Sequence, residues 1–153
     1  MYFISNKGNV SGINESREST EKYIEEAIKQ GYDVKIDLWS IDDRLFLGNH
    51  IPKYETDKDW IYKWTRKLWI HCKNIDSLYF CFECHAHSFW QEYDDYTITT
   101  EGMLWARPGI ISPNQFCVME NPDMYFKIDD LKNIPKAGVC SNNIEYLLNG
   151  LKK

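Results

Sequence analysis

Lys35 and Asp37 are the two residues of this chain whose types and spacing point most directly to chemistry. They stand two positions apart in the apolar run DVKIDLW, residues 33–39, which is typical of a buried strand. Alternate side chains of a strand share one face, so this ammonium and this carboxylate are expected to form an ion pair. In the alternative, Lys35 extends into solvent and Asp37 only accepts backbone hydrogen bonds.

A second set of candidate residues lies in CFECHAH, residues 81–87. Cys81-x-x-Cys84-His85 matches the attachment pattern of c-type haem, and together with His87 these residues have the types that bind zinc. If the run is an extended strand, Cys84 faces away from the other three, which does not suit a tetrahedral site. We therefore expect His85 and His87 to be polar residues at the mouth of the fold.

Two further groups have side chains suited to metal or proton chemistry. Glu92, Asp94 and Asp95 form an acidic stretch that either recruits a cation or is a solvated turn. His71 precedes Lys73 by two residues in LWIHCK, where its imidazole either binds a metal or forms hydrogen bonds.

Size and charge limit the classes of function. The 153 residues suit a single domain spanning 1–153, and the formal net charge of −5 gives no general field for nucleic acid, although a local positive pocket can hold a small anion. No run approaches the length of a membrane span, and the N-terminus lacks the pattern of a signal peptide. We expect a cytoplasmic protein. The cysteines are odd in number, at five, so no disulfide framework is expected.

The first part of the chain has a β-α-β order. A strand over 2–5 is followed by a helix that Ser19 or Thr20 caps and Gly31 ends, and the strand at 33–39 comes next. This order predicts parallel strands joined by a right-handed crossover. A hairpin with a polar turn at Asp42–Asp43 then leads out of the strand.

The remaining chain alternates between helical and strand patterns. Helices are expected over 57–66 and 74–80, and Ser141 is expected to cap a last helix. Counting those at 2–5 and 33–39, there are eight strand candidates; the others fall at 68–73, 84–90, 96–99, 103–106, 115–119 and 137–140. We expect an α/β fold, a shortened TIM-type (β/α) barrel in which loops replace several outer helices, with an open sheet as the alternative.

The order of short motifs resembles the glycerophosphodiester phosphodiesterases of the phospholipase-C-like (PLC-like) phosphodiesterase superfamily, especially a compact branch with shortened barrels. ISNKGN is similar to the family's opening strand and His-Arg-Gly turn, DVKIDLW to its Glu-x-Asp strand, and LFLGNHIPKY to its Gly-His-Asp segment. LWIHCKN resembles the strand that bears a lysine, and FWQEYDDYTIT, MLWARPG and GVCSNNIEYL resemble later strands. The resemblance implies a PLC-like phosphodiesterase fold with reduced outer helices.

The resemblance also implies a reaction and the residues that it needs. In the family, two histidines act as general acid and base, while the Glu-x-Asp pair and another acidic residue hold a divalent cation against the substrate phosphate. The cation offsets the charge that repels a nucleophile, and the leaving alkoxide needs a proton.

Position by position, this chain departs from that pattern. The first catalytic histidine, its arginine neighbour, the metal-binding glutamate and the second catalytic histidine correspond here to Asn6, Lys7, Lys35 and Asn49; only Asp37 and Lys73 match. Asparagine does not titrate near neutral pH, so both acid–base positions lack a proton donor. His50 replaces the second histidine only if the loop shifts by one residue, which reverses side-chain direction in extended chain.

The resemblance with these substitutions implies a protein that binds a phosphorylated small molecule without cleaving it and without a cofactor. The candidate ligand-binding residues are Lys7, Lys35, Asp37, His71, Lys73, His87 and Trp105. One alternative is an active phosphodiesterase that uses Mg²⁺ or Ca²⁺, with the metal and acid–base site rebuilt from Asp37, His50, His71 or the Glu92–Asp95 group. Another is an interaction protein whose aromatic surface meets a partner chain, and an oligomer is compatible with each reading.

Overall fold

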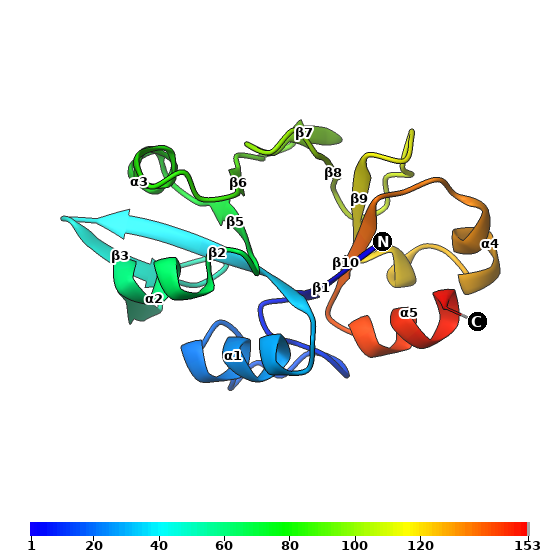
Figure 1. Ribbon diagram of the computed structural model, residues 1–153, viewed down its shortest axis with the longest axis horizontal. Helices are drawn as coiled ribbons and strands as arrows, with labels where there is room; N and C mark the ends of the chain where they lie inside the picture. Colours follow the sequence, from blue (N-terminus) through cyan, green and yellow to red (C-terminus); the bar gives the residue numbers. More distant parts are fainter. Residues whose placement is uncertain (153) are drawn as a thin grey trace.

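The structure, a computed structural model, describes residues 1–152 and has a mixed α/β fold with ten strands and five α-helices (Figure 1). The strands are β1 (Tyr2–Asn6), β2 (Asp33–Ile41), β3 (Arg44–Leu47), β4 (Tyr54–Thr56), β5 (Leu68–Cys72), β6 (Ser88–Phe89), β7 (Tyr96–Ile98), β8 (Leu104–Ala106), β9 (Cys117–Glu120) and β10 (Gly138–Ser141). The helices are α1 (Glu21–Lys29), α2 (Lys58–Trp64), α3 (Ile75–Glu83), η1 (Pro122–Met124, a 3-10 helix), α4 (Ile128–Asn133) and α5 (Ile144–Leu151). None of the helices in residues 1–152 is long and apolar enough to cross a membrane.

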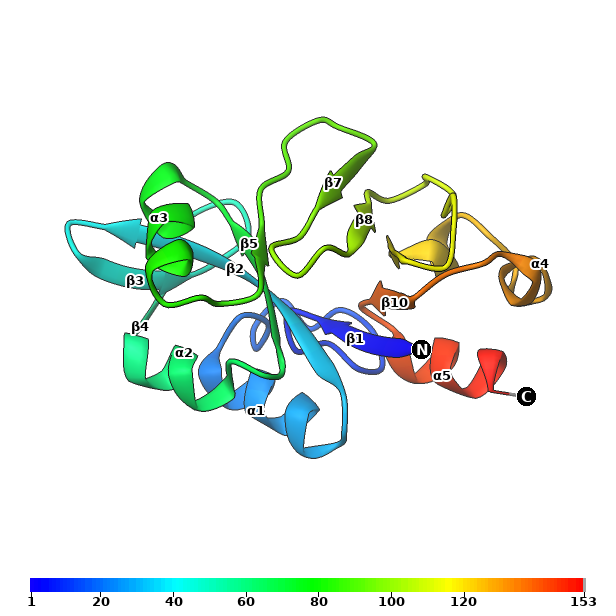
Figure 2. The same cartoon turned by 45° about the horizontal axis from the view of Figure 1, so that its top comes forward.

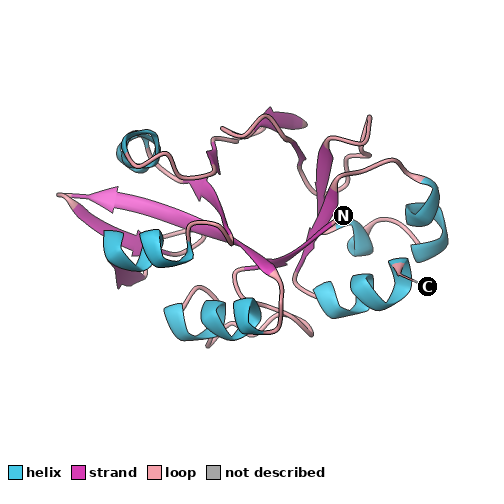
Figure 3. Cartoon of the chain, viewed as in Figure 1, coloured by secondary structure: helices cyan, strands magenta, loops and turns pink. Residues whose placement is uncertain are grey.

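The strands form one sheet that curls into a partial barrel, with helices on its outside (Figure 3). Its path runs β4-β3-β2-β1-β10-β9-β8-β7, while β5 pairs with β2 and β6 with β5. The Thr100 amide donates to the Ser88 carbonyl at 2.8 Å, which links the segment after β7 to β6. The expectation of a curled α/β sheet is therefore confirmed in outline.

The strand β7 departs from a parallel barrel. It runs antiparallel to β8, with Thr97 opposite Trp105, and lies across the ring from β1 (Figure 2). Only residues 99–103 connect the end of β7 at Ile98 to the start of β8 at Leu104, which is too few for a crossover helix. The expectation of parallel strands was wrong for this hairpin.

The N-terminal half follows the sequence pattern closely. The Thr20 hydroxyl accepts from the Tyr23 amide and caps α1, and Gly31 adopts a φ of 99° directly after the helix. Asp42 and Asp43 both have positive φ, as a tight hairpin between β2 and β3 requires. The predicted helix, hairpin and parallel β1–β2 pair are thus confirmed.

Three segments differ from the sequence-based expectation. Residues 84–90 were expected as a strand, but Asn74 and Ser77 form a capping box, α3 continues to Glu83, and only Ser88–Phe89 is strand. Asn143, rather than Ser141, is the N-cap residue of α5, and Ser141 ends β10. The elements β4, η1 and α4 were not predicted. The two helices η1 and α4 are shorter than two helical turns, and the strand β4 is shorter than four residues.

Apolar residues are buried on both faces of the sheet. The larger core lies between the sheet and the helices and includes Ile24, Ile36 and Ile70, each at most 1 % exposed. The smaller core fills the interior of the curled sheet and consists of Ile4, Trp69, Phe89, Trp105, Val118 and Cys140. This interior packing supports the polar side chains that lie towards the carboxyl ends of the strands.

Candidate functional site

A buried charge cluster lies in the interior of the sheet, near the end where β1, β5, β9 and β10 terminate, which we call the mouth. The Lys35 Nζ lies 3.0 Å from Asp37 Oδ1 and 3.6 Å from Glu120 Oε1. Lys35 is 4 % exposed and Asp37 is 1 % exposed. The predicted Lys35–Asp37 ion pair is confirmed, and the alternative with Lys35 in solvent was wrong.

The neighbours of this pair keep both groups charged. Burial alone lowers the pKa of Lys35, but the Asp37 and Glu120 carboxylates outweigh it, so the pKa lies above its ordinary value. Burial raises the pKa of Asp37, yet the Lys35 ammonium and the hydrogen bond from His71 bring it well below its usual range. The ion pair is therefore intact at neutral pH.

His71 extends the cluster on β5. Its Nδ1 lies 3.1 Å from Asp37 Oδ1, its Nε2 lies 3.0 Å from the Gln91 carbonyl oxygen, and its ring stacks on Phe89. Each ring nitrogen of His71 thus faces an oxygen that only accepts hydrogen bonds. Lys35, Asp37, Glu120 and His71 form one connected group of polar side chains. We use charge cluster for these four residues.

Asn6, which the sequence resemblance matches to a catalytic histidine, lies beside the charge cluster. It is 4 % exposed and pairs in register with Lys35 across β1 and β2. Asn6 Oδ1 and Asp37 Oδ2 are buried acceptors that have no hydrogen-bond partner within residues 1–152. Each can accept a hydrogen bond from a donor at the mouth, but the Asn6 amide cannot transfer a proton as histidine does.

The loop after β1 is held to the loop after β10 by a polar network. Lys7, with a φ of 60°, places its Nζ 3.2 Å from Glu18 Oε1. Asn9 Nδ2 donates to Glu18 at 2.8 Å and to Asn142 at 2.9 Å. Glu18 thus compensates Lys7, and Glu120 compensates Lys35. Both lysines were expected to attract phosphate, so the mouth is less positive than the sequence predicts.

Asn49, His50 and Lys73 lie at the rim of the mouth. Asn49 Nδ2 lies 3.3 Å from His50 Nε2, and both residues border a hollow of about 310 Å³ together with Glu18 and Lys53. Lys73 directly follows β5, and its ammonium makes no ion pair within the described part of the chain. These side chains present hydrogen-bond donors at the rim.

Trp105 and His87 do not lie at the mouth, which corrects their assignment as ligand-binding residues. Trp105 is fully buried: its ring packs on Phe89, and its Nε1–H donates to Glu120 at 2.9 Å. His87 precedes β6 at the amino end of the strand, contacts Trp69 and lies 2.7 Å from Thr99 Oγ1. Burial lowers the pKa of His87. Both side chains are core residues whose polar atoms have protein partners.

The other candidate metal ligands are dispersed. Cys81 lies inside α3 with its Sγ 3.7 Å from that of Cys72, while His85 is exposed in a left-handed turn. Asp95 instead forms an exposed ion pair with Arg107 at 2.7 Å. Within residues 1–152, no three His, Cys, Asp or Glu side chains are arranged to hold a metal ion. All five thiols are free.

The charge cluster also fits a divalent cation poorly. The family's metal needs several oxygen ligands at one point, but the Lys35 ammonium lies between the Asp37 and Glu120 carboxylates. A divalent ion there would be repelled by Lys35 and would have to displace it. The residues present do not match the cation site that the resemblance implies for Mg²⁺ or Ca²⁺.

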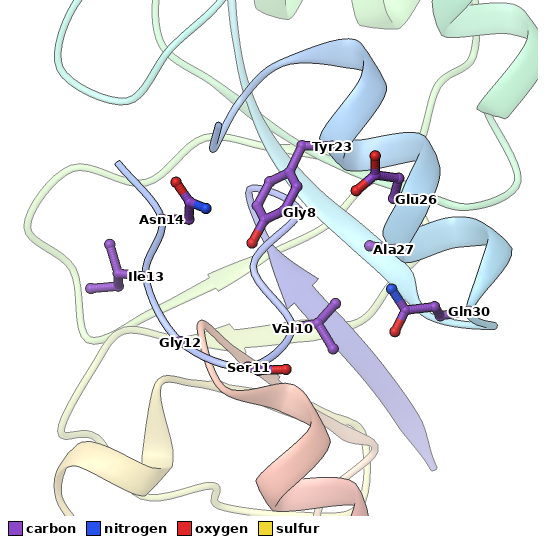
Figure 4. A pocket seen from close by; sticks show the side chains of 10 residues that line it. All are labelled: Gly8, Val10, Ser11, Gly12, Ile13, Asn14, Tyr23, Glu26, Ala27 and Gln30. Carbon is purple, nitrogen blue, oxygen red and sulfur yellow. The ribbon is translucent and has the colours of Figure 1, made fainter. Parts of the chain in front are cut away.

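Figure 4 shows a separate cavity, of about 370 Å³, outside the sheet. It lies between α1 and the loop at 8–14, and Tyr23 and Glu26 are among its lining residues. None of the charge-cluster residues lines it. The cavity is therefore not part of the mouth.

Comparison of the chain with protein-family models, with curated proteins and with solved structures found no match.

Substitutions of Lys35 and Asp37 test whether the ion pair is buried, through their effect on the free energy of unfolding. We expect Lys35→Met, which leaves Asp37 uncompensated, to lower the free energy of unfolding by about 3–5 kcal/mol in urea titrations followed by circular dichroism. The double variant Lys35→Met/Asp37→Leu should be less destabilised, because no unpaired charge of this pair remains. The control Arg44→Met breaks an exposed ion pair with Glu55 and should cost less than about 1 kcal/mol. Equal losses for Lys35→Met and Arg44→Met would contradict the cluster.

The pKa directions of the pair predict how stability depends on pH. Because folding lowers the pKa of Asp37, the free energy of unfolding should fall as the pH drops below about 4. Because folding raises the pKa of Lys35, it should also fall as the pH rises above about 10. Urea titrations at each pH measure this free energy of unfolding. For Lys35→Met/Asp37→Leu, it should change less with pH than in the wild type, both in the acidic and in the alkaline range. Identical pH profiles for this variant and the wild type would refute the assignment.

Proposed function

We propose that this chain is a non-hydrolytic relative of the glycerophosphodiester phosphodiesterases, with a reduced TIM-type barrel of the PLC-like phosphodiesterase superfamily, that binds a phosphorylated small molecule at its mouth. The observation that carries the proposal is the position of the Lys35 ammonium, 3.0 Å from Asp37 and 3.6 Å from Glu120. The proposal assigns this covalently attached cation, which lies between two carboxylates, to the position at which the family holds a divalent ion.

Two requirements of ester cleavage are missing at the positions that the resemblance matches to the family's site. A general acid must protonate the leaving alkoxide, and Asn6 and Asn49 have no titratable proton at the positions that match the family's histidines. A Lewis acid must also polarise the phosphate, and the Lys35 ammonium has no open coordination position. These substitutions support binding without cleavage.

The rim residues support recognition of a phosphate. Lys73 has an ammonium outside any ion pair of the described chain. The side chains of Asn49 and His50 line the rim hollow. Lys7 can donate to a phosphate while it still contacts Glu18. The acceptors Asn6 Oδ1 and Asp37 Oδ2 suit a hydroxyl group on the same ligand.

An active phosphodiesterase with a rebuilt site requires a different proton donor. His71 is the nearest candidate because Asp37 orients its ring, as carboxylates do in acid–base pairs. However, its Nε2 already faces the Gln91 carbonyl at 3.0 Å. Hydrolysis would therefore require His71 to leave this contact.

Ligand binding without metal dependence is the first expected outcome. A panel of phosphodiesters, sugar phosphates and nucleotides should include compounds that raise the melting temperature equally with EDTA, Mg²⁺ or Ca²⁺, because the site uses fixed cations. Lys73→Met should reduce the shift, whereas the matched control Lys132→Met, on exposed α4, should retain it. Turnover of any panel compound that EDTA abolishes would overturn the proposal, as would the absence of any stabilising compound.

Restoration of the family's residues should restore a metal site. We expect the triple variant Asn6→His/Lys35→Glu/Asn49→His to bind Mg²⁺ or Ca²⁺ in calorimetric titrations, because a third carboxylate replaces the ammonium. The control Asn6→His/Lys35→Gln/Asn49→His has the same histidines without the new charge and should bind more weakly. Circular dichroism establishes that both variants fold. A folded triple variant with no gain in metal affinity would refute the proposed correspondence of positions.

A further inference from the structure

A large groove lies outside the barrel, away from the mouth. It has a volume of about 920 Å³ and is bordered by α3, by the β2–β3 hairpin with β4, and by the start of α2. These elements lie together at one end of the molecule (Figures 1 and 2). None of the charge-cluster residues lines the groove, so it can bind a partner independently of the proposed phosphate site.

One wall of the groove is α3, whose exposed apolar face continues beyond the groove and has no partner in the described chain. Ile75, Tyr79 and Phe82 recur along α3 at helical spacing and are 65 %, 64 % and 55 % exposed. Tyr79 also lines the groove, where Tyr62 of α2 is 48 % exposed. Large apolar side chains gathered in this way mark interaction surfaces more often than they mark ordinary solvent-exposed faces.

The charge of the groove restricts what can cover this face. Its lining has six carboxylates and two cations, namely Asp42, Asp43, Glu55, Asp57, Asp76 and Glu83 against Arg44 and Lys58. Glu55 is compensated by Arg44 at 2.7 Å, and Asp57 caps α2 by accepting from the Trp60 amide. The carboxylates of Asp42, Asp43, Asp76 and Glu83 form no ion pair within residues 1–152.

We propose that the groove docks a lysine- or arginine-rich segment of another protein that also has apolar side chains. Carboxylates along the groove attract the basic side chains, and the faces of Tyr62 and Tyr79 add cation–π contacts. The apolar side chains of the segment cover Ile75 and Phe82. Charge complementarity selects this occupant, because an acidic partner, a nucleic acid or an anionic membrane would be repelled.

A labelled peptide of alternating lysine and leucine tests the groove. Its fluorescence anisotropy should increase on addition of the full chain, whereas a peptide of alternating glutamate and leucine should not bind. The variant Asp42→Asn/Asp43→Asn/Asp76→Asn should bind the lysine peptide about tenfold more weakly, because three carboxylates that attract its ammonium groups are neutralised. The control Asp94→Asn/Asp129→Asn/Asp130→Asn makes the same change in charge outside the groove and should bind as the wild type does.

Two residues provide readouts that do not depend on charge. Tyr79→Ala should weaken binding, whereas Tyr146→Ala, at an exposed position on α5, should not. Cys84 lines the groove and is the one partly exposed cysteine of the described chain, so the lysine peptide should slow its alkylation by N-ethylmaleimide. Equal loss of affinity in the groove and control variants, or no binding by the wild type, would overturn the proposal. Neither result bears on phosphate binding at the mouth.

Discussion

The buried contact between the Lys35 ammonium and the Asp37 carboxylate is the constraint on which the rest of the mouth depends. Both groups lose nearly all hydration, with exposures of 4 % and 1 %, and such a loss is tolerated only where charges and hydrogen bonds compensate it. Glu120 and His71 provide that compensation from β9 and β5. Three separate strands, β2, β5 and β9, therefore have to be in register before the Lys35 ammonium is stable in the interior.

The curvature of the sheet provides this register. In an open sheet the strands β5 and β9 would lie far apart, on opposite sides of β2 and β1, so His71 and Glu120 could not both reach the pair. The interior rings of Trp69, Phe89 and Trp105 fill the space below the charge cluster, and the Trp105 indole also holds Glu120 by a hydrogen bond. Core packing and electrostatics thus act on the same side chains. This explains why Trp105 and His87, which were expected to contact a ligand, are core residues instead.

Our two proposals assign different partners to different parts of the molecule. At the mouth, fixed cations and two buried acceptors favour a small phosphorylated ligand that is bound and not cleaved. At the groove beside α3, uncompensated carboxylates and exposed aromatic rings favour a basic segment of another protein. The two sites share no lining residue, although β2 contributes Lys35 and Asp37 to one and continues into the hairpin that borders the other. A rigid β2 is thus the physical connection between them.

The sequence by itself determined the local features: the capped helix α1, the Asp42–Asp43 hairpin, the β-α-β order, and the shared face of Lys35 and Asp37. Each follows from spacing within a few residues, where backbone geometry alone decides the outcome. Glu120 was within reach of sequence reasoning, because it directly follows the strand predicted at 115–119. Only the tertiary structure decided that Lys35 has a second carboxylate, that Glu18 compensates Lys7, and that Trp105 and His87 are core residues. These outcomes depend on contacts between strands and loops far apart in the chain, whose relative positions are set by sheet curvature and not by any local pattern.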